Sequence, residues 1–124
     1  MILCVTLNPC LDKTLTVKSW RPCDLVRGAA VREVVGGKGN NVARALQRLG
    51  RKPRPVTFLG GTVGGHCERL LRSDDRLDPI VVPTEAPTRV ILTVRTDGTA
   101  EQTAFFDPDP AVAPGEAEAL VAQV

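Results

Sequence analysis

The spacing of apolar side chains alternates along the chain between a pattern typical of strands and one typical of helices. Residues 2–7 form an almost continuous apolar run that stops at Asn8-Pro9, as in a strand buried on both faces of a parallel sheet. Residues 14–19 and 30–35 alternate apolar and polar side chains instead, which predicts two half-exposed strands. These two could pair as a small sheet apart from the main one, in a register that the turn residues between them leave open.

Three stretches carry the apolar spacing of a helix. The clearest follows Asn40 and Asn41, both good N-cap residues, because apolar side chains in 42–49 recur at positions i, i+3, i+4 and i+7. A second helix is expected around residues 67–71, after a pair of glycines. A third opens at Pro114, since proline suits the first helical turn, and its apolar positions continue to the last residue of the chain.

Short apolar runs outside these helices predict further strands. They lie at residues 56–59, 80–82, 89–95 and 102–106, and an Asp-Gly turn within 96–99 joins the last two as a hairpin. Strands that alternate with helices predict an α/β fold, to which the half-exposed strands add a β appendage.

Composition and charge are those of a single globular domain. The chain has 124 residues, 43% of them hydrophobic and 24% charged, which is too apolar for intrinsic disorder. Its net charge of +2 is far below the basic excess of a nucleic-acid-binding protein, so no nucleic-acid partner is expected. No apolar run approaches the length of a membrane span and no basic leader precedes the first strand, so we expect no membrane partner and a cytoplasmic location.

The cysteines favour buried thiols over a metal site. There are four, and none forms a CxxC pair of the kind that usually binds zinc. Cys4 falls within a predicted strand and Cys67 on the apolar face of a predicted helix. Reduced, mostly buried thiols are therefore expected, with no metal bound.

A glycine-rich turn, Gly36-Gly37-Lys38-Gly39, leads into the clearest helix. Glycine lets the backbone approach a ligand closely, and the unpaired N–H groups at a helix N-terminus attract anions and polar oxygens. The spacing is not that of a Walker A loop, nor that of the dinucleotide fingerprint, because Val42 stands where the third glycine would be. A ligand loop is the favoured interpretation, and a purely structural turn is the alternative.

Three charged residues are further candidates for ligand binding. Asp12 follows the first strand near its expected carboxyl end, where open α/β sheets bind ligands, and its carboxylate can accept hydrogen bonds from two sugar hydroxyls. An aspartate there is also a common turn residue. Arg89 begins an apolar strand and could present its guanidinium to a phosphate. Arg27, like Arg89, is a weak signal by itself.

Taken in order, these segments resemble a known family. The matching residues are Asn8-Pro9-x-Leu11-Asp12, Arg27, Gly36-Gly37-Lys38-Gly39-x-Asn41-Val42-Ala43-Arg44, Thr88-Arg89 and the Asp-Pro-Asp-Pro stretch at 107–110. Their order and spacing are similar to those of the N-terminal part of the PfkB carbohydrate kinases, and the similarity is greatest to the branch of 1-phosphofructokinase and tagatose-6-phosphate kinase. The resemblance covers nearly the whole chain. Cys10 departs from the usual small Ala or Ser, and Asn40 from the usual Ile or Val.

The resemblance implies that residues 1–124 are the N-terminal portion of a ribokinase-like fold, in which a Rossmann-like α/β body carries a small β-sheet lid. Such a lid closes over the sugar and often mediates dimerisation, so a homodimer through the lid is expected. By position, the implied roles are sugar-hydroxyl contacts for Asp12 and Asn41, a backbone contact for Gly37, and proximity to the substrate phosphate for Lys38, Arg27 and Arg89.

The implied activity is ATP-dependent phosphorylation of a sugar phosphate, such as fructose 1-phosphate to fructose 1,6-bisphosphate, with Mg²⁺. The family's NxxE motif and its Gly-Ala-Gly-Asp motif, which carries the catalytic base, are absent from this sequence. We therefore expect a truncated sugar-binding half with no catalytic residue, inactive alone, with ATP bound by the missing half. The alternatives are a non-catalytic sugar-phosphate-binding or dimerisation module, and a plain structural α/β domain.

Overall fold

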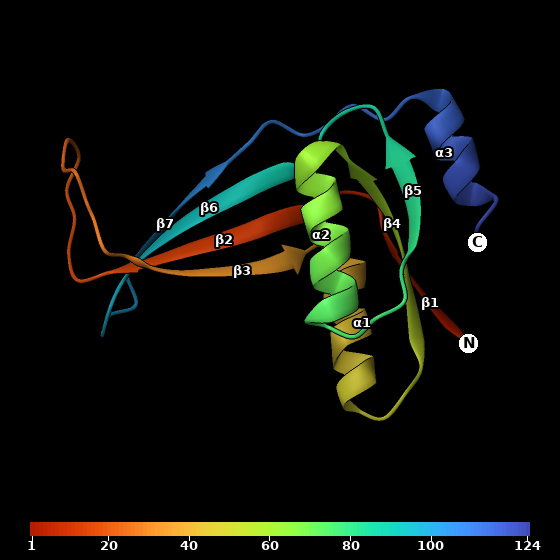
Figure 1. The fold of residues 1–124 in the computed structure, drawn as a ribbon, viewed down its shortest axis with the longest axis horizontal. Helices are drawn as coiled ribbons and strands as arrows, with labels where there is room; N and C mark the ends of the chain where they lie inside the picture. Colours follow the sequence, from red (N-terminus) through yellow and green to blue (C-terminus); the bar gives the residue numbers. More distant parts are fainter.

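The strands form two separate sheets in the computed structural model, which describes residues 1–124 (Figure 1). The first, which we call the body sheet, has three parallel strands in the order β1 (Ile2–Thr6), β4 (Pro53–Gly60) and β5 (Ile80–Thr84). The central strand β4 is buried along most of its length, as expected for a parallel sheet covered on both faces. The three strands predicted in this region are confirmed.

Two helices cover one face of the body sheet. They are α1 (Lys38–Arg48) and α2 (Gly61–Ser73), and both lie on the same side of the body strands in Figure 1. The core beneath them combines residues of both helices with residues of both sheets. Its buried side chains are Cys4, Leu11, Val35, Ala43, Leu59, Cys67, Leu71 and Leu77.

The third helix, α3 (Pro114–Val121), covers the opposite face. Its Leu120 packs in a second, smaller core with Val56, Phe58 and Val82 of β4 and β5. Phe58 faces this core whereas its neighbour Leu59 faces the first one, because successive side chains of a strand point to opposite faces. The body is therefore a three-layer α/β/α sandwich.

The second sheet, which we call the lid sheet, extends away from the body (Figure 1). Its four strands are, in spatial order, β3 (Ala30–Gly36), β2 (Cys10–Val17), β6 (Arg89–Thr96) and β7 (Gln102–Phe106). β2 and β3 are antiparallel, which confirms the predicted pairing and fixes the register that the sequence left open. β6 and β7 form the expected hairpin. The pairing of β6 with β2, in parallel, was not evident from the sequence.

The helix ends differ from the predicted ones. α1 begins at Lys38 with Gly37 as its N-cap, so Asn40 lies inside the first turn. The side chain of Asn40 is fully buried and its Nδ2 donates to the carbonyl of Gly36 at 3.1 Å, a structural contact rather than a cap. α2 already begins at Gly61, within the glycines that the sequence placed before it, and α3 ends at Val121.

The thiols are arranged as expected. Cys4, Cys10 and Cys67 are buried, Cys23 is exposed, and all four are free. Burial raises the pKa of the Cys67 thiol to about 12, because a thiolate is poorly solvated in an apolar core. None of the three helices is long and apolar enough to cross a lipid bilayer.

The carboxylate of Glu116 fixes α3 to the body, and its contribution to the free energy of unfolding depends on pH. Glu116 accepts hydrogen bonds from the backbone N–H groups of Glu85, at 2.8 Å, and Ala113, at 2.9 Å. These bonds hold the pKa of Glu116 below its ordinary value. The stabilisation is therefore present in full above the ordinary glutamate pKa of about 4.3 and is lost as the pH falls through the lower pKa of the folded state.

Thermal unfolding of Glu116→Gln, followed from neutral to acidic pH, checks this expectation. The variant should be less stable than the wild type at neutral pH, and the difference should shrink as the medium becomes acidic. A difference that stays constant with pH would contradict the proposed role of the charge.

Candidate functional site

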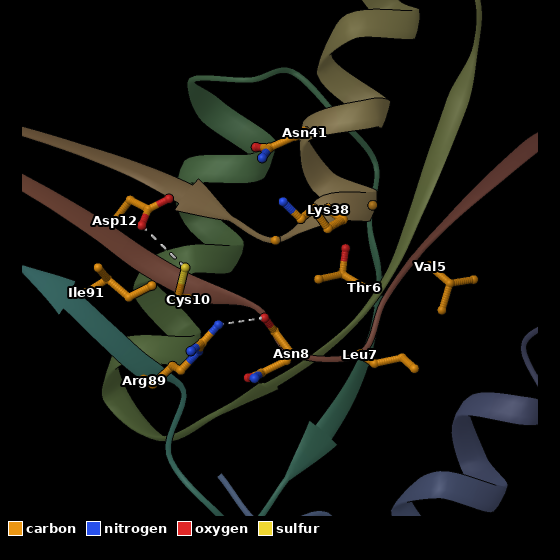
Figure 2. Close-up of a pocket in the computed structure, with 12 residues that line it drawn as sticks. Val5, Thr6, Leu7, Asn8, Cys10, Asp12, Lys38, Asn41, Arg89 and Ile91 are labelled. Atoms are coloured by element: carbon orange, nitrogen blue, oxygen red, sulfur yellow. Dashed lines mark hydrogen bonds between the residues drawn. The ribbon is translucent and has the colours of Figure 1, made fainter. Parts of the chain in front are cut away.

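A pocket of about 530 Å³ lies where the body sheet, the lid sheet and the start of α1 meet. Figure 2 shows side chains of β2 and β6 on one side of it and those of α1 on the other. Five of the six candidate residues line the pocket: Asp12, Gly37, Lys38, Asn41 and Arg89. The other residues that line it are Val5, Thr6, Leu7, Asn8, Cys10, Gly39 and Ile91.

The register of the lid sheet explains the strand side of the pocket. Cys10 lies opposite Arg89 and Asp12 opposite Ile91 in the parallel pairing of β2 with β6. Residues two apart on a strand share a face, so these four side chains form a compact group on the pocket face of the sheet. Asp12 is thus the third residue of β2. Its position in the sequence, shortly after a proline, is also typical of a turn, but the structure places it in a strand.

The carboxylate of Asp12 is half-buried beside the thiol of Cys10. The Cys10 Sγ donates to Asp12 Oδ1 at 3.5 Å. Burial, followed by the negative charge of Asp12, raises the pKa of Cys10 to about 11, so the thiol stays protonated at neutral pH and remains a donor. This leaves most of the acceptor capacity of the Asp12 carboxylate available to hydroxyl groups of a ligand.

The first turn of α1 supplies the opposite side of the pocket. Gly37 has a φ of 116°, a conformation that costs glycine little and other residues much. A Cβ at this position would lie 2.4 Å from Cγ2 of Thr6. The turn therefore brings the N-terminus of α1, with its unpaired N–H groups and the Lys38 ammonium, directly onto the end of β1.

The amide of Asn41 is oriented by Arg44, one turn further along α1. Arg44 Nη1 donates to Asn41 Oδ1 at 2.8 Å. Arg44 is itself held by an ion pair with Asp75 at 2.8 Å and by a hydrogen bond to the carbonyl of Val35. Because Oδ1 is already engaged, Nδ2 of Asn41 is the group left to donate to a ligand oxygen.

The guanidinium of Arg89 is largely buried and is held by three neighbours. Its Nη1 pairs with Asp109 at 3.1 Å, and its Nη2 donates to the carbonyl of Asn8 at 3.4 Å (Figure 2). The guanidinium carbon also lies 5.8 Å from the centre of the Phe106 ring, within the range of a cation–π contact. These contacts fix Arg89 at the edge of the pocket.

Arg27 does not join the other candidates. It lies in the exposed loop between β2 and β3, at the far end of the lid sheet, where it lines a different hollow of about 700 Å³. A single chain therefore brings five of the six candidate residues together and leaves Arg27 apart.

Three residues that support the site were not among its predicted members. Thr6 ends a strand, and its Oγ1 accepts from the backbone N–H of Asn40 at 2.9 Å, which ties α1 to β1. Arg44 and Asp109 lie within segments that carry the family resemblance, but neither was a candidate site residue. The partners that hold them at the site, Asp75 for Arg44 and Arg89 for Asp109, are distant in sequence, which spacing does not reveal.

Comparison with known proteins identifies the family of the chain. The model of the pfkB family carbohydrate kinases matches residues 5–124. The chain belongs to the pfkB family. The expected ribokinase-like architecture, a Rossmann-like α/β body with a β-sheet lid, is therefore confirmed.

Its curated pfkB relatives are sugar-phosphate kinases. The chain is 37% identical over 117 residues to an ATP-dependent 6-phosphofructokinase isozyme 2 of Mycobacterium tuberculosis, covering 94% of this chain and 34% of the relative. It is 31% identical over 101 residues to the 1-phosphofructokinase of Bacillus subtilis, covering 82% of the chain and 33% of the relative. The chain thus spans about a third of the length of these relatives.

Solved pfkB structures share the fold. The phosphofructokinase-2 of Escherichia coli in complex with fructose-6-phosphate superposes with a TM-score of 0.88 at 32% identity, covering 98% of this chain and 40% of that one. A possible 1-phosphofructokinase of Thermotoga maritima superposes with a TM-score of 0.87 at 28% identity, covering 98% and 39%.

The pocket does not fit a magnesium–nucleotide site, although pfkB kinases in general use ATP and a metal ion. No group of three His, Cys, Asp or Glu side chains lies close enough to hold a metal ion. Asp12 is the only carboxylate that lines the pocket, whereas Lys38 and Arg89 both add positive charge. Such a site favours an anion with hydroxyl groups over a divalent cation.

Proposed function

We propose that this chain is the sugar-binding part of an ATP-dependent sugar-phosphate kinase of the 1-phosphofructokinase type. The reaction would convert fructose 1-phosphate to fructose 1,6-bisphosphate. The observation that carries the proposal is that Asp12, Lys38, Asn41 and Arg89 converge on one pocket at the start of a helix. An acid for hydroxyl groups beside two cations for a phosphate suits a phosphorylated sugar better than a neutral sugar or a free anion.

In this proposal each group has a separate task. Asp12 accepts hydrogen bonds from sugar hydroxyls, and Asn41 donates its Nδ2–H to a hydroxyl oxygen. The backbone N–H at Gly37 and the cations Lys38 and Arg89 bind the phosphate that the substrate already carries. Arg27 enters only as a phosphate contact implied by the family, since one chain does not bring it to the pocket.

The transfer step needs groups beyond these residues. In the proposed reaction the acceptor hydroxyl forms a bond to the γ-phosphorus of ATP, the bond to ADP breaks, and a base takes the hydroxyl proton. Asp12 is the only acid that lines the pocket, and it is assigned to binding. The base and the ATP and Mg²⁺ sites are therefore proposed to lie in the remainder of a longer kinase.

We expect the 124-residue chain to bind sugar phosphates weakly and to catalyse nothing. Charge-assisted hydrogen bonds of roughly 1.5–3 kcal/mol each only just offset the cost of association, so Kd should be about millimolar or weaker. A coupled assay for ADP release, with fructose 1-phosphate, fructose 6-phosphate and tagatose 6-phosphate as substrates, should show no turnover. Turnover by the purified chain would contradict this expectation, and the assay applied to a longer protein containing these residues tests the kinase activity.

A second candidate is a sugar-phosphate-binding or dimerisation module without catalysis. It is favoured by the apolar side chains that the lid sheet exposes on the face away from the pocket, among them Val31 and Phe105, which are 57% and 55% exposed. Burial of such a surface would stabilise a homodimer through the lid. Sedimentation of the purified chain tests this candidate: self-association that Phe105→Ser weakens supports it, and a monomer at all concentrations excludes the dimer.

A further inference from the structure

Asp109, in the segment that follows β7, neutralises the Arg89 guanidinium at the rim of the pocket. Its Oδ1 accepts from Arg89 Nη1 at 3.1 Å and from Asn8 Nδ2 at 3.0 Å. The side chain of Asp109 is 74% exposed, whereas that of Arg89 is 14% exposed. An exposed carboxylate thus provides the counter-charge of a largely buried cation.

The backbone delivers Asp109 to this place. The N–H of Asp107 donates to the carbonyl of Val90 at 3.0 Å, and the N–H of Val90 donates to the Asp107 carboxylate at 2.9 Å. Pro108 and Pro110 restrict the chain on either side. These contacts place Asp109 next to Arg89, and its exposed side chain has room to rotate toward solvent.

Each terminal nitrogen of Arg89 already has one of its two N–H groups engaged. Nη1 is paired with Asp109 and Nη2 with the carbonyl of Asn8. Nε is buried and has no hydrogen-bond partner within the chain. A phosphate oxygen can reach the guanidinium most easily at Nη1, because the partner to be replaced there is the exposed carboxylate. Two anions at one guanidinium repel each other, so the carboxylate of Asp109 opposes the binding of a phosphate there.

We propose that Asp109 is an internal competitor for Arg89, which the phosphate of the ligand displaces. This inference rests on the proposed function, because it assigns Arg89 to the substrate phosphate. Asp109 lowers the affinity of the empty pocket for anions in general and selects for a ligand whose hydroxyl contacts with Asp12 and Asn41 add to its phosphate contacts.

The test is Asp109→Asn, which keeps an oxygen to accept from Asn8 and removes the charge. Exposed ion pairs contribute up to about 1 kcal/mol, so the variant should bind inorganic phosphate about threefold to fivefold more tightly than the wild type. Asp78→Asn is the matched control: Asp78 is 68% exposed and pairs with Arg54 at 3.1 Å and with Arg72 at 3.0 Å, away from the pocket. It makes the same change in net charge and should leave phosphate affinity unchanged.

The two ligands separate this inference from the proposed function. NMR titrations with inorganic phosphate and with fructose 6-phosphate give both affinities in the millimolar range. Tighter phosphate binding by Asp109→Asn, with no added affinity for the sugar phosphate, supports the inference and contradicts the sugar-phosphate site. Equal or weaker binding by Asp109→Asn shows that Asp109 supports Arg89 instead, which overturns the inference. Absence of any binding by either protein overturns both.

The side-chain amide of Asn8 reports the displacement directly in the wild type. Since Asn8 Nδ2 donates to Asp109, its NH₂ resonances should shift together with those of Arg89 as phosphate is added. If the Arg89 resonances shift while those of the Asn8 amide stay unchanged, Asp109 remains in place, contrary to the proposal.

Discussion

Replacement of Gly39 by alanine is expected to destabilise the chain by about 3 kcal/mol and to abolish ligand binding. A Cβ at Gly39 would lie 2.3 Å from the carbonyl oxygen of Val5 and 2.6 Å from Oγ1 of Thr6. The first contact is with backbone and cannot be relieved by a change of rotamer, so α1 has to move away from β1. That movement would break the hydrogen bond between Asn40 and Thr6 and open the pocket at the Lys38 end.

Urea unfolding measures the loss, and Gly65→Ala is the matched control. Gly65 lies within α2, and a Cβ there would meet nothing within 4 Å. Because alanine is the better helix former, this control should gain about 0.5–1 kcal/mol. Equal stability of Gly39→Ala and the wild type would show that the close approach of α1 to β1 is not required.

Asp12→Ala is expected to weaken sugar-phosphate binding about 100-fold or more, beyond detection for a millimolar site. Loss of the carboxylate removes acceptors for two hydroxyl groups, and hydrogen bonds to charged groups contribute roughly 1.5–3 kcal/mol each. The stability of the fold should change little, because the only hydrogen bond to the carboxylate within the chain comes from the Cys10 thiol. NMR titration with fructose 6-phosphate measures the affinity and urea unfolding the stability.

Two further variants of β2 make this test specific. Thr14→Ala changes the next residue on the same face of the strand, outside the pocket, and should leave the affinity as it is. Asp12→Asn keeps one acceptor and loses the charge, so its affinity should fall between those of the wild type and Asp12→Ala. If Asp12→Ala binds as well as the wild type, the assignment of the pocket as a sugar site is wrong.

Local spacing was enough to predict most of the fold. The body strands and the β2–β3 pair were visible because apolar runs and alternation depend only on neighbouring residues. The start of α1 was misplaced because two asparagines resemble N-caps, whereas Gly37 can serve as the cap only through its φ of 116°. The place of β6 could not be predicted, because its pairing with β2 joins residues 79 positions apart, as Cys10 and Arg89 show.

The candidate site was predicted as a set of residues but not as a set of contacts. Family resemblance gave Asp12, Lys38, Asn41 and Arg89, and the structure brings them to one pocket. The resemblance gave no sign that Arg89 is already paired with Asp109, since that ion pair depends on where the chain turns after β7. The resemblance also placed Arg27 with the other candidates, whereas the loop that carries Arg27 lies at the end of the lid sheet far from the pocket.

The shared core of body and lid has a mechanical consequence. Leu11 and Val35 of the lid sheet are buried in the same cluster as Leu59 and Leu71 of the body. The root of the sheet, next to Asp12, is therefore anchored, whereas at the strand ends far from the body Val17 is the only buried apolar side chain. Bending of the sheet should concentrate in that outer portion, so the tip can swing without changing the spacing between Asp12 and Lys38.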